Sequence, residues 1–264
     1  MNISDAIIIA IVEGITEFIP ISSTGHMIIT GKLLNVPDDA FTKLFTIAIQ
    51  FGAILSVVVL YYKQFFNFKK WQFYLKLMAG VLPALLIGFL FSDRIDEMLE
   101  STTTVAITML VGGVILFFID SLFKKPVIEK VENIGYKESI MIGLWQCIAM
   151  IPGVSRSAAS IIGGMQQKLT RNLAAEFSFF LAVPTMLAAT GYKLLKHYQT
   201  EGGFNSEEIK LLAIGNVVAF IVAMLAIKFF ITFLKKYGFR VWGIYRIIVG
   251  LILLALIATG KINK

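Results

Sequence analysis

The sequence predicts an all-α polytopic membrane protein with six transmembrane helices plus two re-entrant helical hairpins in an inverted-topology repeat. Three observations support this class: an apolar composition, six long apolar runs, and two further runs that polar residues interrupt. Of the 264 residues, 57% are hydrophobic and only 16% are charged, with a mean hydropathy of +0.80. Such values exceed those of soluble domains. The sequence has no series of alternating ten-residue strands, which argues against a barrel, and we treat residues 1–264 as a single membrane domain.

Six apolar runs are long enough to cross a bilayer. A hydrocarbon core of about 30 Å requires roughly 20 helical residues. The predicted spans are 41–62, 75–92, 104–123, 173–195, 210–234 and 240–260.

Two other apolar stretches are interrupted and are predicted to enter the membrane without crossing it. Pro20 and the following Ser-Ser-Thr-Gly run divide residues 4–34, and the sequence Pro-Gly-Val-Ser-Arg-Ser, which begins at Pro152, divides residues 138–167. Each arm has about 12–16 residues, too few to span at 1.5 Å per residue. Irregular backbone at membrane depth is tolerated where protein or a watery cavity surrounds it. Both stretches therefore indicate re-entrant hairpins.

The two interrupted stretches also indicate an internal repeat. Each precedes three predicted spans, which gives repeat one at about 1–123 and repeat two at about 138–260. Aligning Pro20 with Pro152 pairs "GITEFIPISSTG" with "QCIAMIPGVSRS". An odd number of crossings per repeat inverts the second copy, and in inverted repeats the interrupted helices meet near the midplane.

The loop charges orient the chain in the membrane. If each hairpin returns to its starting side, one face carries an excess of basic residues and the other an excess of acids. The basic face contains Lys63, Lys69, Lys70, Lys124, Lys125, Lys130, Lys137, Lys168, Arg171, Lys235, Lys236 and Arg240. The opposite face contains Asp38, Asp39, Asp93, Asp96, Glu97, Glu100, Glu201, Glu207 and Glu208. The positive-inside rule then places both termini outside. The net charge of +7 thus reflects topology, and we expect no nucleic-acid partner.

The arm before the first break carries two carboxylates. Glu13 and Glu17 have i, i+4 spacing and share one helix face. A charge at membrane depth costs about 2.5 kcal/mol or more, so such residues mark functional sites. Together they could bind a hard divalent cation such as Mg²⁺ or Ca²⁺ through oxygen ligands. Alternatively, one carboxyl could stay protonated and act as an acid or base.

After Pro20 the sequence predicts a new helix start rich in hydroxyl groups. Ser22 or Ser23 could cap this helix, and the amides that follow would form an anion site. Thr24 is a further candidate for substrate binding, although capping and hydrogen bonding alone are the favoured roles of Ser22 and Thr24. His26, three residues after Ser23, is a candidate general base or orienting group, although a buried histidine can also serve packing alone.

The second break supplies the positive charge. Arg156 cannot lose its proton and needs an anionic partner. With helix-start amides and the hydroxyl groups of Ser155, Ser157 and Ser160, it forms a predicted phosphate cradle. A structural salt bridge to Glu13 or Glu17 is the alternative, and the two are compatible if substrate binding rearranges the pair. Gln50 is a further polar candidate for the cavity lining.

Together, "EGITEFIPISSTGH" and "PGVSRSAAS" resemble the bacterial undecaprenyl-diphosphate phosphatase family, also called the bacitracin-resistance protein family. The resemblance covers essentially the whole chain and implies an interdigitated inverted repeat, a plasma-membrane location and a divalent-metal requirement. It implies that Glu13 and Glu17 are the essential acids, that Ser23 and His26 are catalytic candidates, and that Arg156 binds the diphosphate with support from Ser155 and Ser160. Ala158 and Ser160 stand where the family commonly has glycine and threonine, and both changes keep the chemistry.

The expected reaction is removal of the terminal phosphate from a C55 lipid diphosphate, which recycles the carrier for cell-wall synthesis. Either Ser23 attacks phosphorus and His26 takes its proton, or His26 and a glutamate activate water. The alternative is a secondary transporter or lipid-phosphate flippase, since paired broken helices are also typical of transporters. The sequence leaves open whether the chain forms a homodimer.

Overall fold

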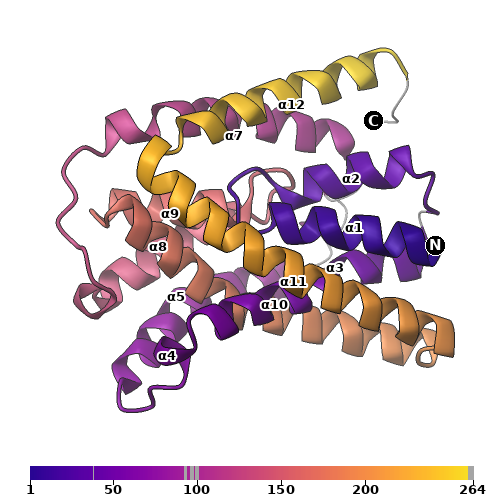
Figure 1. Ribbon diagram of the computed structural model, residues 1–264, viewed down its shortest axis with the longest axis horizontal. Helices are drawn as coiled ribbons and strands as arrows, with labels where there is room; N and C mark the ends of the chain where they lie inside the picture. Colours follow the sequence, from indigo (N-terminus) through magenta and orange to yellow (C-terminus); the bar gives the residue numbers. More distant parts are fainter. Residues whose placement is uncertain (38, 92–93, 96–97, 99–100, 261–264) are drawn as a thin grey trace.

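A computed structural model describes residues 1–37, 39–91, 94–95, 98 and 101–260 (Figure 1). Six of its helices are long and apolar enough to cross a membrane. They are α3 (Ala40–Leu60), α5 (Trp71–Leu90), α7 (Thr102–Leu122), α10 (Arg171–Glu201), α11 (Ser206–Tyr237) and α12 (Arg240–Ala258). The six predicted spans are confirmed, although residue 92 of the second lies outside the described residues. The helices α10 and α11 extend beyond their predicted spans, to 31 and 32 residues.

Four shorter helices form the two predicted hairpins. They are α1 (Ile3–Thr16), α2 (Ser23–Leu33), α8 (Tyr136–Ile148) and α9 (Arg156–Gln166). At 1.5 Å per residue these helices are about 16 to 21 Å long, short of the bilayer core. Short connecting helices, α4 (Tyr62–Phe65) and η1 (Val131–Asn133), lie on the basic face.

The second helix of each hairpin begins at a serine cap with an unusual backbone conformation. Ser22 and Ser155 have φ values of 71° and 77°, and each side chain accepts a hydrogen bond at 3.3 Å from the amide three residues later. The structural equivalent of Ser155 is therefore Ser22, one residue away from the Ser23 that the proline alignment pairs with it. The shift arises because Gly153, at φ 85°, adds a residue between proline and cap in the second break.

The hairpin of each repeat packs against a helix of the other repeat. Helix α1 packs on α11, and α8 packs on α5. Glycines permit both approaches: Gly14 faces the backbone of α11 at Ala219, and Gly143 faces the backbone of α5 at Gly80. Helices α7 and α12 run side by side along one edge of the molecule (Figure 1). The two repeats are thus interdigitated, and the breaks between α1 and α2 and between α8 and α9 lie together at the centre.

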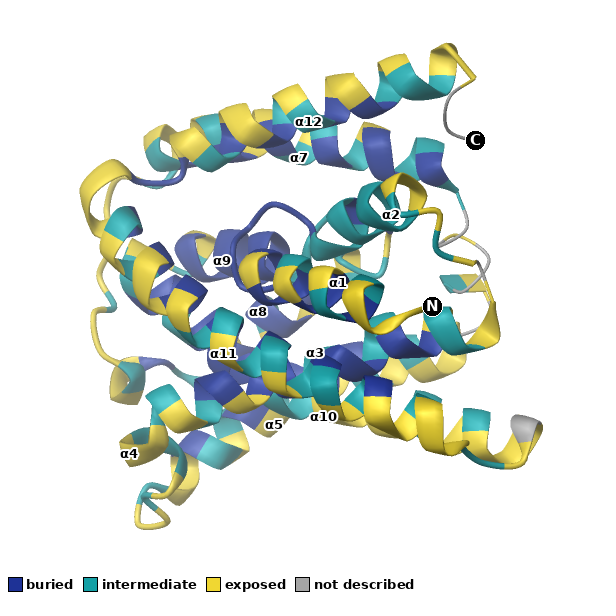
Figure 2. Cartoon of the chain, turned by 45° about the vertical axis from the view of Figure 1, so that its right-hand side comes forward, coloured by how far each residue is buried: buried dark blue, intermediate teal, exposed yellow. Residues whose placement is uncertain are grey.

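Burial follows the same plan. Buried residues concentrate around the hairpins, whereas the outer faces of α7, α11 and α12 are exposed (Figure 2). Those faces carry large apolar side chains, for example Phe118, Leu225 and Leu251, which suit contact with lipid. Of the acids predicted on the outer face, Asp38, Asp93, Asp96, Glu97 and Glu100 lie outside the described residues, as does the side chain of Glu201.

Candidate active site

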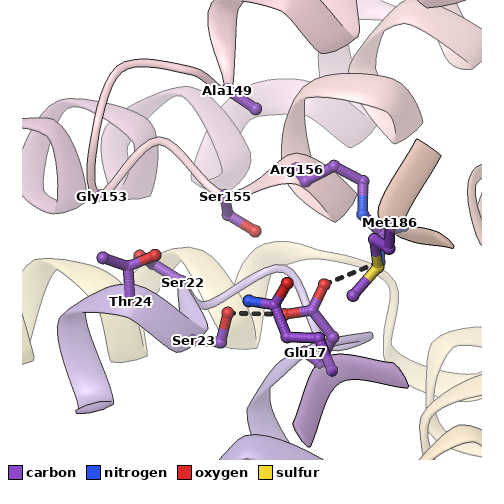
Figure 3. A pocket seen from close by; sticks show the side chains of 10 residues that line it. Glu17, Ser22, Ser23, Thr24, Ala149, Gly153, Ser155, Arg156 and Met186 are labelled. Carbon is purple, nitrogen blue, oxygen red and sulfur yellow. Dashed lines mark hydrogen bonds and ion pairs between the residues drawn. The ribbon is translucent and has the colours of Figure 1, made fainter. Parts of the chain in front are cut away.

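The two breaks enclose a polar cavity of about 180 Å³. Residues from both breaks line it, together with side chains of α3 and α10 (Figure 3). Seven of the predicted site residues are among the lining residues: Glu17, Ser22, Ser23, Thr24, Gln50, Ser155 and Arg156. The structure therefore brings together groups that lie more than 130 positions apart in the chain.

Glu17 lies at the centre of this site and joins the two breaks. Its residue is only 7% exposed. The hydroxyl group of Ser23 donates to Oε2 of Glu17 at 2.7 Å, and Nη2 of Arg156 donates to Oε1 at 2.9 Å. A serine, a carboxylate and a guanidinium thus form one hydrogen-bonded chain along the cavity wall (Figure 3).

Arg156 is held by more than its carboxylate partner. Its Nη1 donates to the Ser178 carbonyl oxygen at 3.1 Å, and the guanidinium lies 5.5 Å from the centre of the Phe18 ring. Its Nε has no hydrogen-bond partner among the described residues. The salt bridge to Glu17, which the sequence offers as the alternative to phosphate binding, is present, and the same guanidinium lines the cavity.

The serines of the second break divide into two groups. Ser155 lines the cavity, and its hydroxyl group lies 3.0 Å from that of Ser157. Ser157 donates to the Ile19 carbonyl oxygen at 3.1 Å, which ties the second break to the first. Ser160 donates to the Arg156 carbonyl oxygen at 2.8 Å. Ser157 and Ser160 are not among the described residues that line the cavity, so their direct contact with substrate stays a prediction. Their hydrogen bonds to backbone carbonyl groups indicate a structural role.

His26 uses both ring nitrogens away from Ser23. Its Nδ1 lies 2.7 Å from the Ser22 carbonyl oxygen, and its Nε2 lies 2.7 Å from the Tyr245 hydroxyl group. Because a carbonyl oxygen only accepts, Nδ1 must carry a proton, and in the neutral ring Nε2 then accepts from Tyr245. The geometry favours the orienting role of His26, and the residue that accepts from Ser23 is Glu17.

Within the described structure, Glu13 is not among the residues that line the cavity, and one of its carboxylate oxygens is without a hydrogen-bond partner. It is 1% exposed, it interacts directly with Glu17, and its Oε1 has no hydrogen-bond partner among the described residues. Two carboxyl groups there face one guanidinium, so a further cation or a proton is needed for neutrality. In the described part of the chain no group of three or more Asp, Glu, His or Cys residues could hold a metal. Two carboxylates with water and phosphate oxygens suffice for Mg²⁺, so the residues fit such an ion.

Four residues that the sequence interpretation did not single out contribute to the site. Met186 lines the cavity, Ser178 and Tyr245 hold Arg156 and His26, and Arg246 binds the backbone of both breaks. Only Arg246 carries a local signal in the sequence, because it is an arginine within a predicted span, and intramembrane charges mark functional positions. The others depend on contacts that no local pattern reveals.

The fold and the site define a polytopic membrane protein whose two re-entrant hairpins build an internal polar cavity that contains a buried Glu–Arg ion pair. Comparison with known sequences is consistent with this description: the family model described as "Bacitracin resistance protein BacA" matches residues 6–252. The chain belongs to this family.

Curated relatives cover nearly the whole chain. A protein of Flavobacterium johnsoniae named undecaprenyl-diphosphatase is 57% identical over 96% of this chain and 96% of its own length. Proteins of the same name from Bdellovibrio bacteriovorus and Porphyromonas gingivalis are 52% and 50% identical, each over 98% of both chains.

Proposed function

We propose that this protein is an integral membrane phosphatase that hydrolyses undecaprenyl diphosphate to undecaprenyl phosphate and phosphate. One observation carries the proposal: the chain from Ser23 through Glu17 to Arg156, which joins a hydroxyl nucleophile, an acceptor for its proton and an anion-binding cation in one cavity. Family membership and the names of the relatives support the same activity and favour it over a transporter.

Substrate binding begins with Arg156. A diphosphate that enters the cavity offers oxygen atoms that compete with Glu17 for the guanidinium, and Arg binds phosphate in a planar, bidentate manner. The helix starts at Ser22 and Ser155 add backbone amides and the positive ends of two helix dipoles. The prenyl tail would then leave the cavity between helices and lie in the bilayer.

Release of Glu17 from Arg156 prepares the nucleophile. Oε2 of Glu17, which already accepts a hydrogen bond from the Ser23 hydroxyl group, takes the Ser23 proton, while Oε1, released from Arg156, becomes available to a divalent cation. Ser23 Oγ then forms a bond to the terminal phosphorus while the bond from that phosphorus to the bridging oxygen breaks. Undecaprenyl phosphate leaves, and water hydrolyses the phosphoserine. In the second route a water bound by Glu17 attacks phosphorus directly, without a phosphoserine.

A divalent cation, Mg²⁺ or Ca²⁺, fits the acidic side of the site. Glu13 and Glu17 would hold it through carboxylate oxygens, and the unpartnered Oε1 of Glu13 supports this assignment. When bound, such an ion neutralises charge on phosphate oxygens. Arg156 and the helix-start amides provide the remaining stabilisation of the developing charge.

The cellular setting follows from this activity. We place the protein in the bacterial plasma membrane, with both termini outside, where it recycles the lipid carrier for cell-wall synthesis and contributes to bacitracin resistance. Association into a homodimer stays a prediction, which mass measurement of the detergent-solubilised protein can decide.

The deciding experiment is phosphate release by purified protein in detergent, which removes any transmembrane gradient. Undecaprenyl diphosphate and farnesyl diphosphate would be compared, each with and without a chelator. We expect phosphate release from the wild type and none above background from Glu17→Ala or Arg156→Ala, both folded by size-exclusion chromatography. Near-normal release by either variant would contradict the proposal, as would lipid transport without hydrolysis.

A further inference from the structure

Arg246 of α12 is a fully buried arginine at the meeting point of the two breaks. It is 0% exposed, and its guanidinium donates hydrogen bonds to five backbone carbonyl oxygens. These belong to Met109 at 3.3 Å, Pro20 at 3.2 Å, Val154 at 2.9 Å, Thr108 at 3.2 Å and Gly153 at 2.9 Å. An arginine side chain has five N–H groups, so its donor capacity is used completely.

The partners of Arg246 identify what it does. Pro20 belongs to the first break, Gly153 and Val154 belong to the second, and a broken helix leaves such carbonyl groups without intrahelical partners. Within the described part of the chain no carboxylate forms a salt bridge with Arg246. An ion pair therefore does not explain why this charge is buried, whereas binding the backbone of both breaks does.

Helix α7 supports the same region from the other repeat. Thr108 stands six residues after the start of α7 at Thr102, as Arg246 stands six residues after the start of α12 at Arg240. The Thr108 hydroxyl group donates to the Pro152 carbonyl oxygen at 2.5 Å. The carbonyl groups of Pro20 and Pro152 are thus each bound by a side chain from the paired helices α7 and α12, and each of these side chains comes from the opposite repeat.

The bonds of Arg246 also set the direction of an amide in the site. In a trans peptide the C=O and N–H groups point to opposite sides. The Val154 carbonyl group points at Arg246, so the N–H group of Ser155, in the same peptide unit, points away from Arg246. Ser155 itself lines the cavity. Ser155 caps the helix that begins with Arg156. A change in the Arg246 bonds would therefore rotate the amide and shift the start of the helix that carries the anion-binding guanidinium.

We propose that Arg246 is a positioning residue that holds the two breaks in register, so that the Ser155 amide and Arg156 face Ser23 and Glu17. It acts through five backbone carbonyl groups and does not touch the substrate. The catalytic consequence rests on the proposed phosphatase function, whereas the effect on diphosphate binding does not.

Two variants with matched controls test this role. Arg246→Lys keeps the charge but offers three N–H groups for five carbonyl oxygens; Arg240→Lys, at an exposed position of the same helix, is its control. Gly112→Ala leaves Arg246 in place but puts a Cβ atom against its guanidinium, so the side chain must move. Gly191→Ala is the control for this change, because nothing lies within 4 Å of the added Cβ there.

Three quantities would be measured for each purified protein. They are kcat and KM for undecaprenyl diphosphate, the melting temperature, and the concentration of methylenediphosphonate that gives half of its maximal thermal protection. Displacement of a substrate-binding group by 1 Å can lower the reaction rate about 100-fold, so we expect kcat/KM of Arg246→Lys to fall roughly 100-fold. We expect half-protection to need at least about 10-fold more methylenediphosphonate, in line with lost orientation of Arg156. Gly112→Ala should change in the same direction, and both controls should match the wild type.

Each outcome decides the proposal. A folded Arg246→Lys protein with normal kcat, KM and methylenediphosphonate protection overturns it. If Arg246→Lys does not fold, Gly112→Ala decides by the same criteria. If neither folds while both controls do, Arg246 serves stability alone and the positioning role is rejected. If the wild type binds methylenediphosphonate but releases no phosphate, the proposed phosphatase function is rejected. The methylenediphosphonate protection data then decide by themselves whether Arg246 is a positioning residue.

Discussion

Glu17 and Arg156 are 139 residues apart in the chain, yet their side chains lie 2.9 Å apart across the two breaks. The pair is nearly buried, with side-chain exposures of 6% for Glu17 and 14% for Arg156. Removing one partner of such a pair leaves an uncompensated charge, whereas an entering phosphate can replace one partner by another anion. In the proposed function, the entering diphosphate exchanges this bond for one between Arg156 and its own oxygen atoms.

This exchange depends on the guanidinium geometry of Arg156. Arg156→Lys keeps the charge but loses the planar fork, so we expect kcat/KM to fall roughly 100-fold, the size of effect seen when one preorganised donor is removed. Steady-state phosphate release would measure it. Arg171→Lys, at a salt bridge with Asp120 outside the cavity, is the control and should match the wild type. Equal activity of Arg156→Lys and the wild type would exclude bidentate phosphate binding.

Ser23 and Ser22 are adjacent hydroxyl residues with different expected roles. Ser23→Ala should abolish turnover if the hydroxyl group attacks phosphorus, and a phosphoserine should be trapped by acid quench in the wild type. Ser22→Ala removes a helix cap instead, so we expect a loss of about 1 kcal/mol or more in stability with turnover retained in part. Substantial turnover by Ser23→Ala, without a trapped phosphoenzyme, would favour attack by water.

His26 can be tested by a side chain that keeps one of its bonds. In His26→Asn the amide N–H group can still donate to the Ser22 carbonyl oxygen, whereas His26→Ala loses that bond. For an orienting role we expect His26→Asn to turn over at least about 10-fold faster than His26→Ala. If His26 is instead a general base, both variants should lose the same factor in kcat, typically 100-fold or more. The ratio of the two kcat values distinguishes these roles, and Tyr245→Phe should resemble the milder variant.

Metal removal tests the acidic pair. We expect a chelator to abolish turnover and Mg²⁺ or Ca²⁺ to restore it. The melting temperature of the wild type should also rise with added metal, because a ligand that binds only the folded state stabilises it. Glu13→Gln removes one of the two proposed carboxylate ligands and should weaken this rise. Full turnover in excess chelator would contradict the metal assignment, and an unchanged rise in Glu13→Gln would exclude Glu13 as a ligand.

The predicted orientation can be read from two loops in intact cells. After replacement of the single cysteine by Cys147→Ala, new cysteines would be introduced by Glu207→Cys and Lys125→Cys, both at exposed positions. A membrane-impermeant maleimide should label the first variant and not the second until the cells are opened. The reverse labelling pattern would place the termini in the cytoplasm.

Much of the architecture was predictable because it depends on local composition. The length of an apolar run sets whether a helix can span, and a proline with hydroxyl residues at membrane depth predicts a break. A charged side chain at membrane depth has a high free energy, so Glu17 and Arg156 could be recognised in the sequence as candidate site residues. The structure brings the two side chains together.

The remaining features arise from contacts between distant segments. The equivalence of Ser22 and Ser155 depends on backbone dihedral angles, which the prolines do not determine. The partner of His26 is Tyr245, on the last helix, and no spacing rule connects positions that far apart. The extra turns of α10 and α11 carry polar residues outside the apolar runs, so hydropathy alone ended these spans too early.

The bond between Arg246 and Pro20 has a consequence for biosynthesis. The carbonyl group of Pro20 receives its partner from a residue made 226 positions later. At about 5–20 residues per second, the ribosome needs roughly 10 to 45 s to reach that residue. The first hairpin therefore leaves the ribosome before Arg246 exists, and the carbonyl group of Pro20 can receive this hydrogen bond only after α12 has been made. Chains that end before Arg246 should expose this unfinished break to membrane quality-control proteases.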